Sequence, residues 1–117
     1  KTHTRTKETK KVKETIKIIL LEGIFSLYNE KIRRITDYSI YIDINEETRL
    51  NRRIIRDKKY RKRTEKDIIQ QYKNTVKPMY EKFIEPTKKF ADIIIKKIDE
   101  TDNEYIKLQS VINKYII

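Results

Sequence analysis

The chain has 117 residues, of which 40% are charged, and its formal net charge is +11. This length allows one domain or part of one, and the absence of cysteine excludes disulfides and thiolate metal sites. The longest apolar run is far shorter than the roughly 20 residues that span a bilayer, so we expect a cytoplasmic protein with no membrane partner.

The start of the chain is predicted to form a polar arm followed by a buried strand. Residues 1–15 are rich in lysine and threonine and show little periodicity, which predicts a basic arm. Residues 18–21 are apolar and end at Glu22 and Gly23, a pattern typical of a strand buried on both faces that carries a carboxylate to a sheet edge. The alternative for Glu22 is a solvated acid in front of a glycine turn.

A short helix near residues 29–34 and a second strand over residues 37–43 are predicted next. Asn45 then provides a helix cap, and the helix is expected to run over residues 46–58. The order strand, helix, strand, helix predicts an α/β fold with parallel strands and right-handed crossovers. Ligands in such sheets gather at the carboxyl ends of the strands, where Glu22 would lie.

The basic segment over residues 56–64 is the candidate lid. Lysine fills exposed positions all along the chain, so the arginines are the more informative cations. Arg56, Arg61 and Arg63 stand between two predicted helices, and Thr64 caps the second of them. Because the guanidinium fork matches phosphate oxygens, this segment is predicted to close over phosphates. The alternative is a solvated run of charge.

The remaining chain predicts a helix, a strand and a closing helix. The third helix is expected to kink or restart at Pro78 and to end at Pro86. Residues 90–95 predict a third buried strand, residues 96–105 a charged loop, and residues 106–117 an amphipathic helix.

Five segments, taken together, carry the most specific pattern of the chain. They are H-T-R at residues 3–5, LLEGIFSLY at 20–28, YIDINEETRLNRRIIRD at 41–57, R-K-R at 61–63 and IIQQYKNTVKPMYEKFIEPTKKFADIII at 68–95. In this combination they resemble the carboxyl-terminal half of a uridine kinase (uridine-cytidine kinase). The joint pattern V-K-P…F-x-x-P-T-K-x-x-A-D-x-I-I is highly specific.

The resemblance implies the second half of a P-loop-type nucleoside kinase, with parallel strands, flanking helices and a helical lid. Such an enzyme transfers the γ-phosphoryl group of ATP or GTP to the 5′-hydroxyl of uridine or cytidine with Mg²⁺. Residues 1–117 would then be a partial domain, whose amino-terminal half with the phosphate loop and the general-base aspartate precedes this chain. Because Gly23 is the single glycine, the chain cannot build a phosphate loop, and alone it is expected to be inactive.

The resemblance also implies roles for seven residues. Glu22 resembles the acid that helps hold Mg²⁺, and His3 resembles the histidine that contacts the pyrimidine base. The residues that resemble the other nucleoside contacts are Arg53, Arg63 and Gln71. The residues that resemble the catalytic lid arginines, which meet the phosphates, are Arg56 and Arg61. Lys62 stands where the lid of the family usually has a glycine.

Two other classes of function remain open. One is a basic module that binds RNA or an acidic surface; the net charge alone favours it, and it predicts salt-sensitive binding with little sequence preference. The other is a catalytically silent half that associates through exposed strand edges, either with a partner or as a homo-oligomer.

Overall fold

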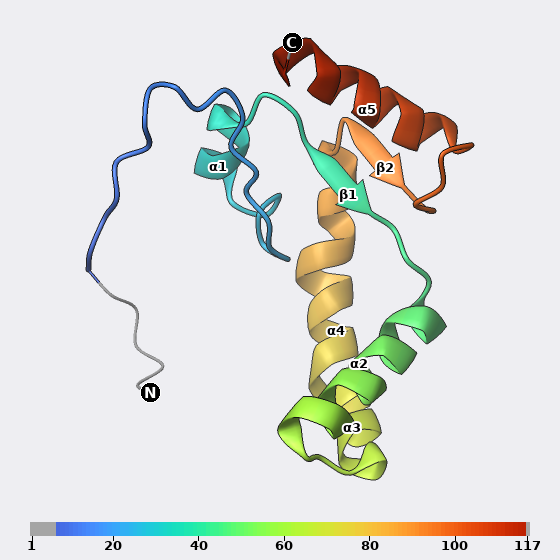
Figure 1. Cartoon of the computed structure of the whole chain (residues 1–117). Coiled ribbons are helices and arrows are strands. Elements are labelled where there is room, and N and C mark those ends of the chain that lie inside the picture. Colours follow the sequence, from blue (N-terminus) through green and yellow to red (C-terminus); the bar gives the residue numbers. More distant parts are fainter. Residues whose placement is uncertain (1–6, 117) are drawn as a thin grey trace.

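The computed structural model describes residues 7–116, and a pair of parallel strands lies near its centre (Figure 1). Strand β1 (Ile40–Ile42) pairs with β2 (Ile93–Ile95) in a register that places Tyr41 opposite Ile94. The chain between the strands carries most of the helices and provides the long crossover that parallel strands require. The predicted α/β class with parallel strands is confirmed, and both strands are shorter than the sequence pattern indicates.

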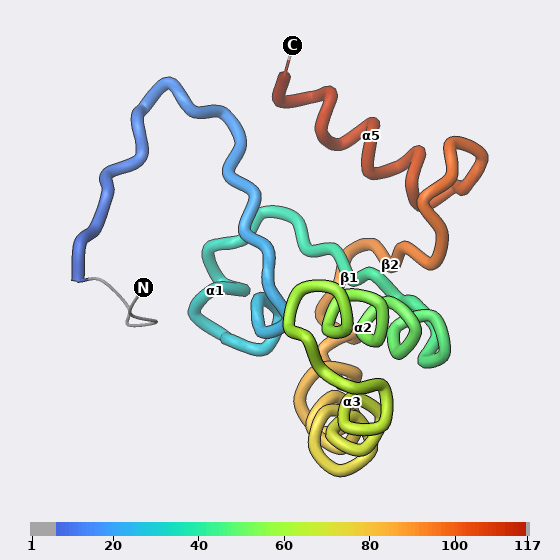
Figure 2. Tube along the Cα trace, turned by 60° about the horizontal axis from the view of Figure 1, so that its bottom comes forward, coloured from blue at the N-terminus to red at the C-terminus, as the bar shows by residue number. Residues whose placement is uncertain are grey.

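The helical elements include one long rod built of several helix types. In chain order they are α1 (Glu30–Ile35), α2 (Glu46–Arg61), α3 (Glu65–Gln71), the π-helical η1 (Tyr72–Val76), α4 (Lys77–Met79), the π-helical η2 (Tyr80–Ile84), the 3₁₀ helix η3 (Glu85–Phe90) and α5 (Asn103–Ile116). From α3 to η3 they follow one another without a break, and Figure 2 looks nearly along this rod. Helix α2 packs against α3 at the end of the rod far from the strands, whereas α5 packs against β2 (Figure 1). Among the described residues, no helix combines the length and apolar character needed to cross a bilayer.

Two helices begin at the caps that the sequence predicts. The side-chain oxygen of Asn45 accepts a hydrogen bond from the backbone N–H of Thr48 at 2.8 Å, at the start of α2. The hydroxyl of Thr64 accepts one from the N–H of Asp67 at 3.2 Å, at the start of α3. Each cap satisfies one of the N–H groups that a helix start leaves without an intrahelical acceptor. The two caps therefore set where α2 and α3 begin.

Helix α5 begins at Asn103 and not at residue 106. The carboxylate of Asp102 accepts hydrogen bonds from the N–H groups of Glu104 and Tyr105, both at 3.0 Å. This aspartate is a helix cap that the charged composition of the segment concealed. The charged loop is therefore shorter than predicted.

The core is small and is contributed by the two strands, the helical rod and the turn before α1. Its buried apolar side chains are Leu27, Tyr41, Ile68, Tyr72, Ile93 and Ile95. Ile68 is fully buried and Tyr72 nearly so, one turn apart on the same face of the rod. This stripe holds the rod in place and, with it, the hairpin of α2 and α3.

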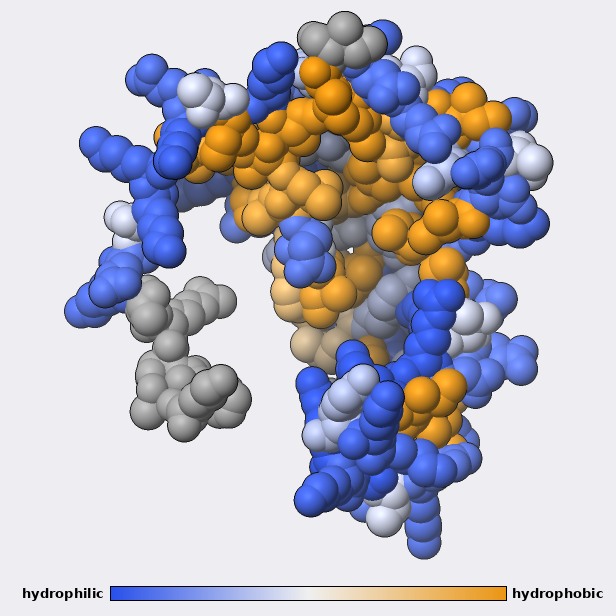
Figure 3. All heavy atoms as spheres, viewed as in Figure 1, coloured by the Kyte–Doolittle hydropathy of each residue, from blue (hydrophilic) through white to orange (hydrophobic). Residues whose placement is uncertain are grey.

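The buried strand predicted over residues 18–21 is wrong in this structure. These residues follow an irregular path and are exposed, with Leu20 83% accessible. An apolar strand is buried only where neighbouring strands take its backbone hydrogen bonds and cover its faces. Within residues 7–116, β1 and β2 pair only with each other, so this segment joins no ladder. Figure 3 shows apolar side chains (orange) gathered across the upper part of this face of the molecule.

The two prolines of the rod begin new helical segments. Pro78 lies in the first turn of α4, directly after the π-helical η1, so the predicted restart is confirmed. Pro86 does not end the helix as predicted, because η3 continues to Phe90 with this proline in its first turn. Proline lacks an N–H and crowds the preceding turn, and both problems are smallest where a helical segment begins. A change of helix type at each proline keeps the rod continuous.

Candidate functional site

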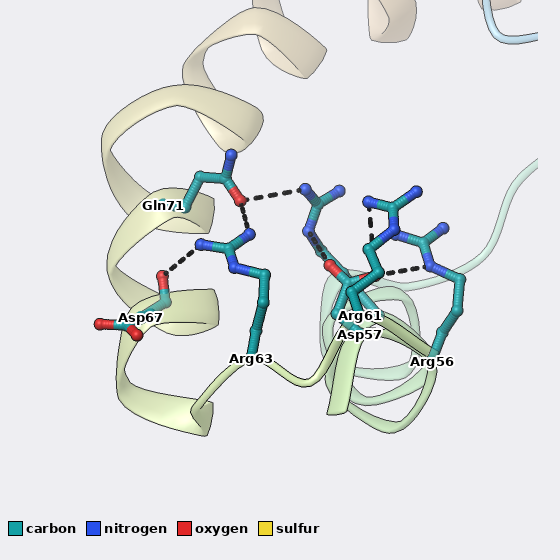
Figure 4. A network of polar contacts seen from close by, with 7 residues as sticks. Arg56, Asp57, Arg61, Arg63, Asp67 and Gln71 are labelled. Atoms are coloured by element: carbon teal, nitrogen blue, oxygen red, sulfur yellow. Dashed lines mark hydrogen bonds and ion pairs between the residues drawn. The ribbon is translucent and has the colours of Figure 1, made fainter. Parts of the chain in front are cut away.

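A buried carboxylate faces three arginines in the α2–α3 hairpin (Figure 4). The side chain of Asp57 in α2 is 0% exposed. Arg56 donates a hydrogen bond from Nε to its Oδ1 at 2.8 Å, and Nη1 of Arg61 lies 3.6 Å from the same oxygen. Nε of Arg53 lies 3.7 Å from Oδ2. We call Arg53, Arg56 and Arg61 the arginine array.

Helix geometry explains how one aspartate reaches three guanidiniums. Arg53 and Arg61 stand four residues before and after Asp57, the spacing that places side chains on one helix face. The hydrogen bond from Arg56, and then the charges of the array, hold the pKa of the Asp57 carboxyl below its ordinary value, although burial opposes this shift. Asp57 is therefore ionised, and one negative charge faces three positive ones. The excess positive charge points to solvent on Arg56 and Arg61, which are 50% and 58% exposed.

Three of the four residues predicted to bind the nucleoside meet at one atom. Oε1 of Gln71, at the end of α3, accepts hydrogen bonds from Nη1 of Arg63 and, at 3.5 Å, from Nη2 of Arg53. Arg63 also reaches the backbone carbonyl of Asp67 at 3.5 Å (Figure 4). Arg53 belongs to both groups, because its Nε faces Asp57 while its Nη2 faces Gln71. The residues predicted to contact the nucleoside and those predicted to contact the phosphates are thus connected through the guanidinium of Arg53.

The candidate lid over residues 56–64 is largely helical. Helix α2 runs past the predicted end near residue 58, so Arg56 and Arg61 lie on the helix and not in a loop. Lys62 ends α2 in the left-handed conformation, with φ 51° and ψ 35°, at the position where the resemblance expects glycine. That conformation turns the chain sharply toward α3. Whether residues 56–64 act as a lid stays a prediction.

Two other predicted site residues stand apart from this cluster. His3 lies outside the described residues. Glu22 is exposed and, within residues 7–116, makes no hydrogen bond or ion pair. No group of three or more acidic or histidine side chains in the described part of the chain could hold a metal ion. One carboxylate suits a magnesium ion held mainly by substrate phosphates and water, but these residues do not form a magnesium site by themselves.

Arg33 is a structural residue that the sequence pattern does not reveal. Its Nη1 donates to the carbonyl oxygens of Leu27 at 2.7 Å and Tyr28 at 2.8 Å, in the turn that follows Glu22. Its guanidinium also lies 3.9 Å from the ring centroid of Phe90. This one side chain ties the turn, α1 and the end of the rod together. An arginine in the last turn of a short helix reads as solvated, so only the packing identifies it.

A second polar network lies at the carboxyl end of β1. The hydroxyls of Tyr41 and Tyr80 are 2.7 Å apart, and Tyr80 donates to Glu85 at 2.7 Å. Lys88 pairs with Glu85 at 2.7 Å and with Asp43 at 3.1 Å. Burial raises the pKa of Tyr80, and the hydrogen bond from Lys88 lowers the pKa of Glu85.

An open cleft of about 310 Å³ borders this network. Besides Asp43, Tyr80 and Glu85, its walls include Arg49, whose guanidinium lies 3.7 Å from the centroid of the Tyr80 ring. Such a position, outside the carboxyl end of a parallel strand, is where α/β folds gather ligands. Each acidic group of the network already has a cation beside it, so the network reads as packing between β1 and the rod.

The chain is similar to one known family and to several curated proteins. The model of the phosphoribulokinase/uridine kinase family matches residues 1–104. The uridine kinase of Lactobacillus helveticus is 48% identical over 116 residues, which are 96% of this chain and 54% of that protein. The uridine kinase of Listeria monocytogenes serotype 4a is 42% identical over 118 residues, covering 97% and 56%. That of Staphylococcus haemolyticus is 50% identical over 93 residues, covering 80% and 44%. The chain spans about half the length of the curated relatives it matches.

Proposed function

Because the chain belongs to the phosphoribulokinase/uridine kinase family, we propose that it supplies the nucleoside and phosphate contacts of a uridine kinase. The reaction transfers the γ-phosphoryl group of ATP or GTP to the 5′-hydroxyl of uridine or cytidine. The observation that carries the proposal is the meeting of Arg53 and Arg63 on Gln71, since Arg53 also belongs to the arginine array. We also propose a cytoplasmic location, as the composition predicts.

The two sets of residues suit the two substrates. Gln71 uses its carbonyl oxygen on the arginines, which leaves its amide N–H groups to donate to a uridine hydroxyl or carbonyl. Arg53 and Arg63, held by that carbonyl, present further N–H donors to the nucleoside. Donors held in fixed positions favour ligands that carry acceptors at the matching places.

The half-exposed guanidiniums of Arg56 and Arg61 suit the phosphates of the nucleotide. Phosphoryl transfer depends mainly on positioning and on the neutralisation of charge that spreads over the moving group. Guanidiniums that are already in position can stabilise that charge without the cost of reorganising solvent. When bound, Mg²⁺ would neutralise further phosphate charge, and Glu22 is the residue we propose to contact it; His3 is proposed to contact the pyrimidine.

A diffuse nucleic-acid patch fits these residues less well. A patch of that kind gains affinity from the number of cations and gains nothing from a buried counter-charge among them. The array holds such a counter-charge in Asp57, which cancels part of its positive charge. An ordered site for a small anionic ligand accounts better for that arrangement.

The test is steady-state kinetics with the complete gene product that contains these residues, with uridine and ATP varied separately. Arg56→Ala and Arg61→Ala should lower kcat by about tenfold or more, because contacts to the phosphates strengthen in the transition state. Arg53→Ala and Arg63→Ala should mainly raise the KM for uridine, because nucleoside contacts act equally in the ground state. Arg52→Ala is the control, since Arg52 is exposed on the same helix and makes no hydrogen bond or ion pair with these residues in the described part of the chain.

The 117 residues alone should show no uridine-dependent ADP formation, because a chain with one glycine supplies no phosphate loop. Two results would contradict the proposal. One is a folded complete protein without uridine-dependent turnover. The other is an equal, salt-sensitive loss of activity in all five arginine variants, which would indicate a general charge effect.

A further inference from the structure

We infer that Asp57 is the positioning residue of the site: its buried carboxylate holds the guanidiniums of the arginine array in one fixed arrangement, in which Arg56 and Arg61 bind phosphate. Neither the sequence pattern nor the comparisons give this residue a role. The inference rests on the proposed function, in that Arg56 and Arg61 of the array bind a phosphate group of a nucleotide. Asp57 itself is fully buried and does not touch the ligand.

The side-chain contacts support this role. Asp57 is reached from positions i−4, i−1 and i+4 of one helix, so its two oxygens face all three guanidiniums at once. Oδ2 of Asp57 and Nε of Arg53 are both buried without a hydrogen-bond partner in the described part of the chain, and they face each other at 3.7 Å. The carboxylate therefore has bonding capacity left, and a small movement of Arg53 would close the pair.

The main chain of Asp57 adds a second constraint. Its carbonyl oxygen accepts hydrogen bonds from the backbone N–H groups of Lys62 and, at 3.3 Å, of Arg63. The same residue therefore fixes the turn from which Arg63 reaches Gln71. The side chain and the main chain of Asp57 together connect Arg56 and Arg61, which we propose to bind phosphate, to Arg63, which we propose to bind the nucleoside.

The charges explain why positioning is the role and attraction is not. A negative charge buried among three arginines weakens the pull of the array on a phosphate. It also restrains long side chains that otherwise lose conformational freedom when a ligand binds. Without the charge of Asp57, weaker repulsion of the phosphate would tighten binding, whereas lost restraint of the arginines would weaken it. A variant that removes the charge and keeps the shape of the side chain therefore distinguishes the two effects.

The experiment measures the dissociation constant of inorganic pyrophosphate by calorimetry, with the complete gene product and its Asp57→Asn variant. Positioning predicts about tenfold weaker binding in Asp57→Asn, although the variant carries one more net positive charge. Asp37→Asn, the same change at an exposed residue between α1 and β1, should bind slightly tighter or unchanged. Equal or tighter binding by Asp57→Asn would overturn the inference, as would a wild-type protein that binds no pyrophosphate.

A second measurement covers the case in which Asp57→Asn does not fold. In the wild type, the Nε–H proton of Arg56 should exchange with water at least about tenfold more slowly than that of exposed Arg52, by NMR with labelled arginine. Asp57→Glu keeps the charge but moves the carboxylate, so positioning predicts weaker pyrophosphate binding and attraction predicts no change. Equal exchange rates, or unchanged binding in Asp57→Glu, would also overturn the inference. These readouts need no kinase activity, so failure of the proposed uridine reaction would be seen separately.

Discussion

Lys62 carries the turn between α2 and α3 in a backbone conformation that favours glycine. Its φ of 51° is the only positive value at a residue other than glycine in residues 7–116. A side chain in this region crowds its own carbonyl, at a cost of roughly 1 kcal/mol. The hydrogen bonds from the backbone N–H groups of Lys62 and Arg63 to the carbonyl of Asp57 offset that cost. The lysine thus retains the turn that glycine would form with less strain.

Replacing Lys62 with glycine should therefore raise the free energy of unfolding by about 0.5 kcal/mol, after the extra entropy of glycine in the unfolded chain is counted. Lys59→Gly is the matched control, because Lys59 is also exposed but lies inside α2. There glycine should cost about 1 kcal/mol. Urea unfolding of both variants checks this, and a loss of stability in Lys62→Gly equal to that in Lys59→Gly would refute it.

Asp57 should make stability depend on pH in one direction. Its pKa in the folded protein is lowered by the hydrogen bond from Arg56 and by the charges of the array. A carboxyl with a lowered pKa stabilises the fold above its unfolded pKa, and this contribution is lost as the pH falls through the folded value. Asp57→Asn should thus lower the free energy of unfolding by about 2 kcal/mol at pH 7. The difference in the free energy of unfolding between the wild type and Asp57→Asn should shrink below about pH 4, where aspartate ordinarily begins to protonate.

Urea unfolding of the wild type and Asp57→Asn at a series of pH values provides the measurement. A gap of constant size from neutral to acidic pH would mean that the lost stability comes from packing and not from ionisation.

At the scale of elements, α1 and the turn after Glu22 are attached to the rod by few contacts. Hydrogen bonds from Arg33 join α1 to the turn, and its guanidinium contacts the ring of Phe90 at the end of the rod. An edge-to-face contact between Tyr28 and Phe83, with centroids 5.8 Å apart, is an apolar link to the rod. Beyond Leu27, this part of the chain buries little apolar surface. Its position relative to the helical hairpin therefore depends on a small number of side chains, and so does the position of Glu22.

Arg33→Lys should lower the free energy of unfolding by about 1 kcal/mol, because an ammonium cannot serve both carbonyls and the Phe90 ring together. The backbone N–H of Tyr28, which donates to Phe25 at 3.1 Å, should exchange faster with water. Arg34→Lys is the control, since its pair with Glu30 is exposed and should change stability by less than about 0.5 kcal/mol. Hydrogen exchange and thermal unfolding test the difference, and equal behaviour of the two variants would remove Arg33 from this role.

At the scale of the whole molecule, features that depend on residues close together in the sequence could be predicted. Features that depend on contacts between distant residues could not. The caps at Asn45 and Thr64 were predictable because a cap and its helix lie within a few residues. The strand over residues 18–21 was not, because its burial depends on other strands that must lie beside it. The sequence predicts a helix end at Pro86, whereas the rod changes helix type there and continues to Phe90.

The candidate site divides in the same way. The spacing of Arg53 and Arg61 around Asp57 is visible in the sequence, but the burial of Asp57 depends on how α2 packs against α3. The meeting of Arg63 with Gln71 likewise depends on the left-handed turn between those helices. Resemblance to a family suggested these residues, and the fold explains how two helices can bring them together.

Gln71→Ala offers the most direct measurement of the account, because the carbonyl of Gln71 joins Arg53 to Arg63. In the complete gene product, this change should raise the KM for uridine by about tenfold while kcat changes by less than about twofold. Gln70→Ala, a change at the exposed neighbour, should leave both constants unchanged. A KM for uridine that is the same in both variants, or a loss confined to kcat, would contradict the assignment of this site to the nucleoside.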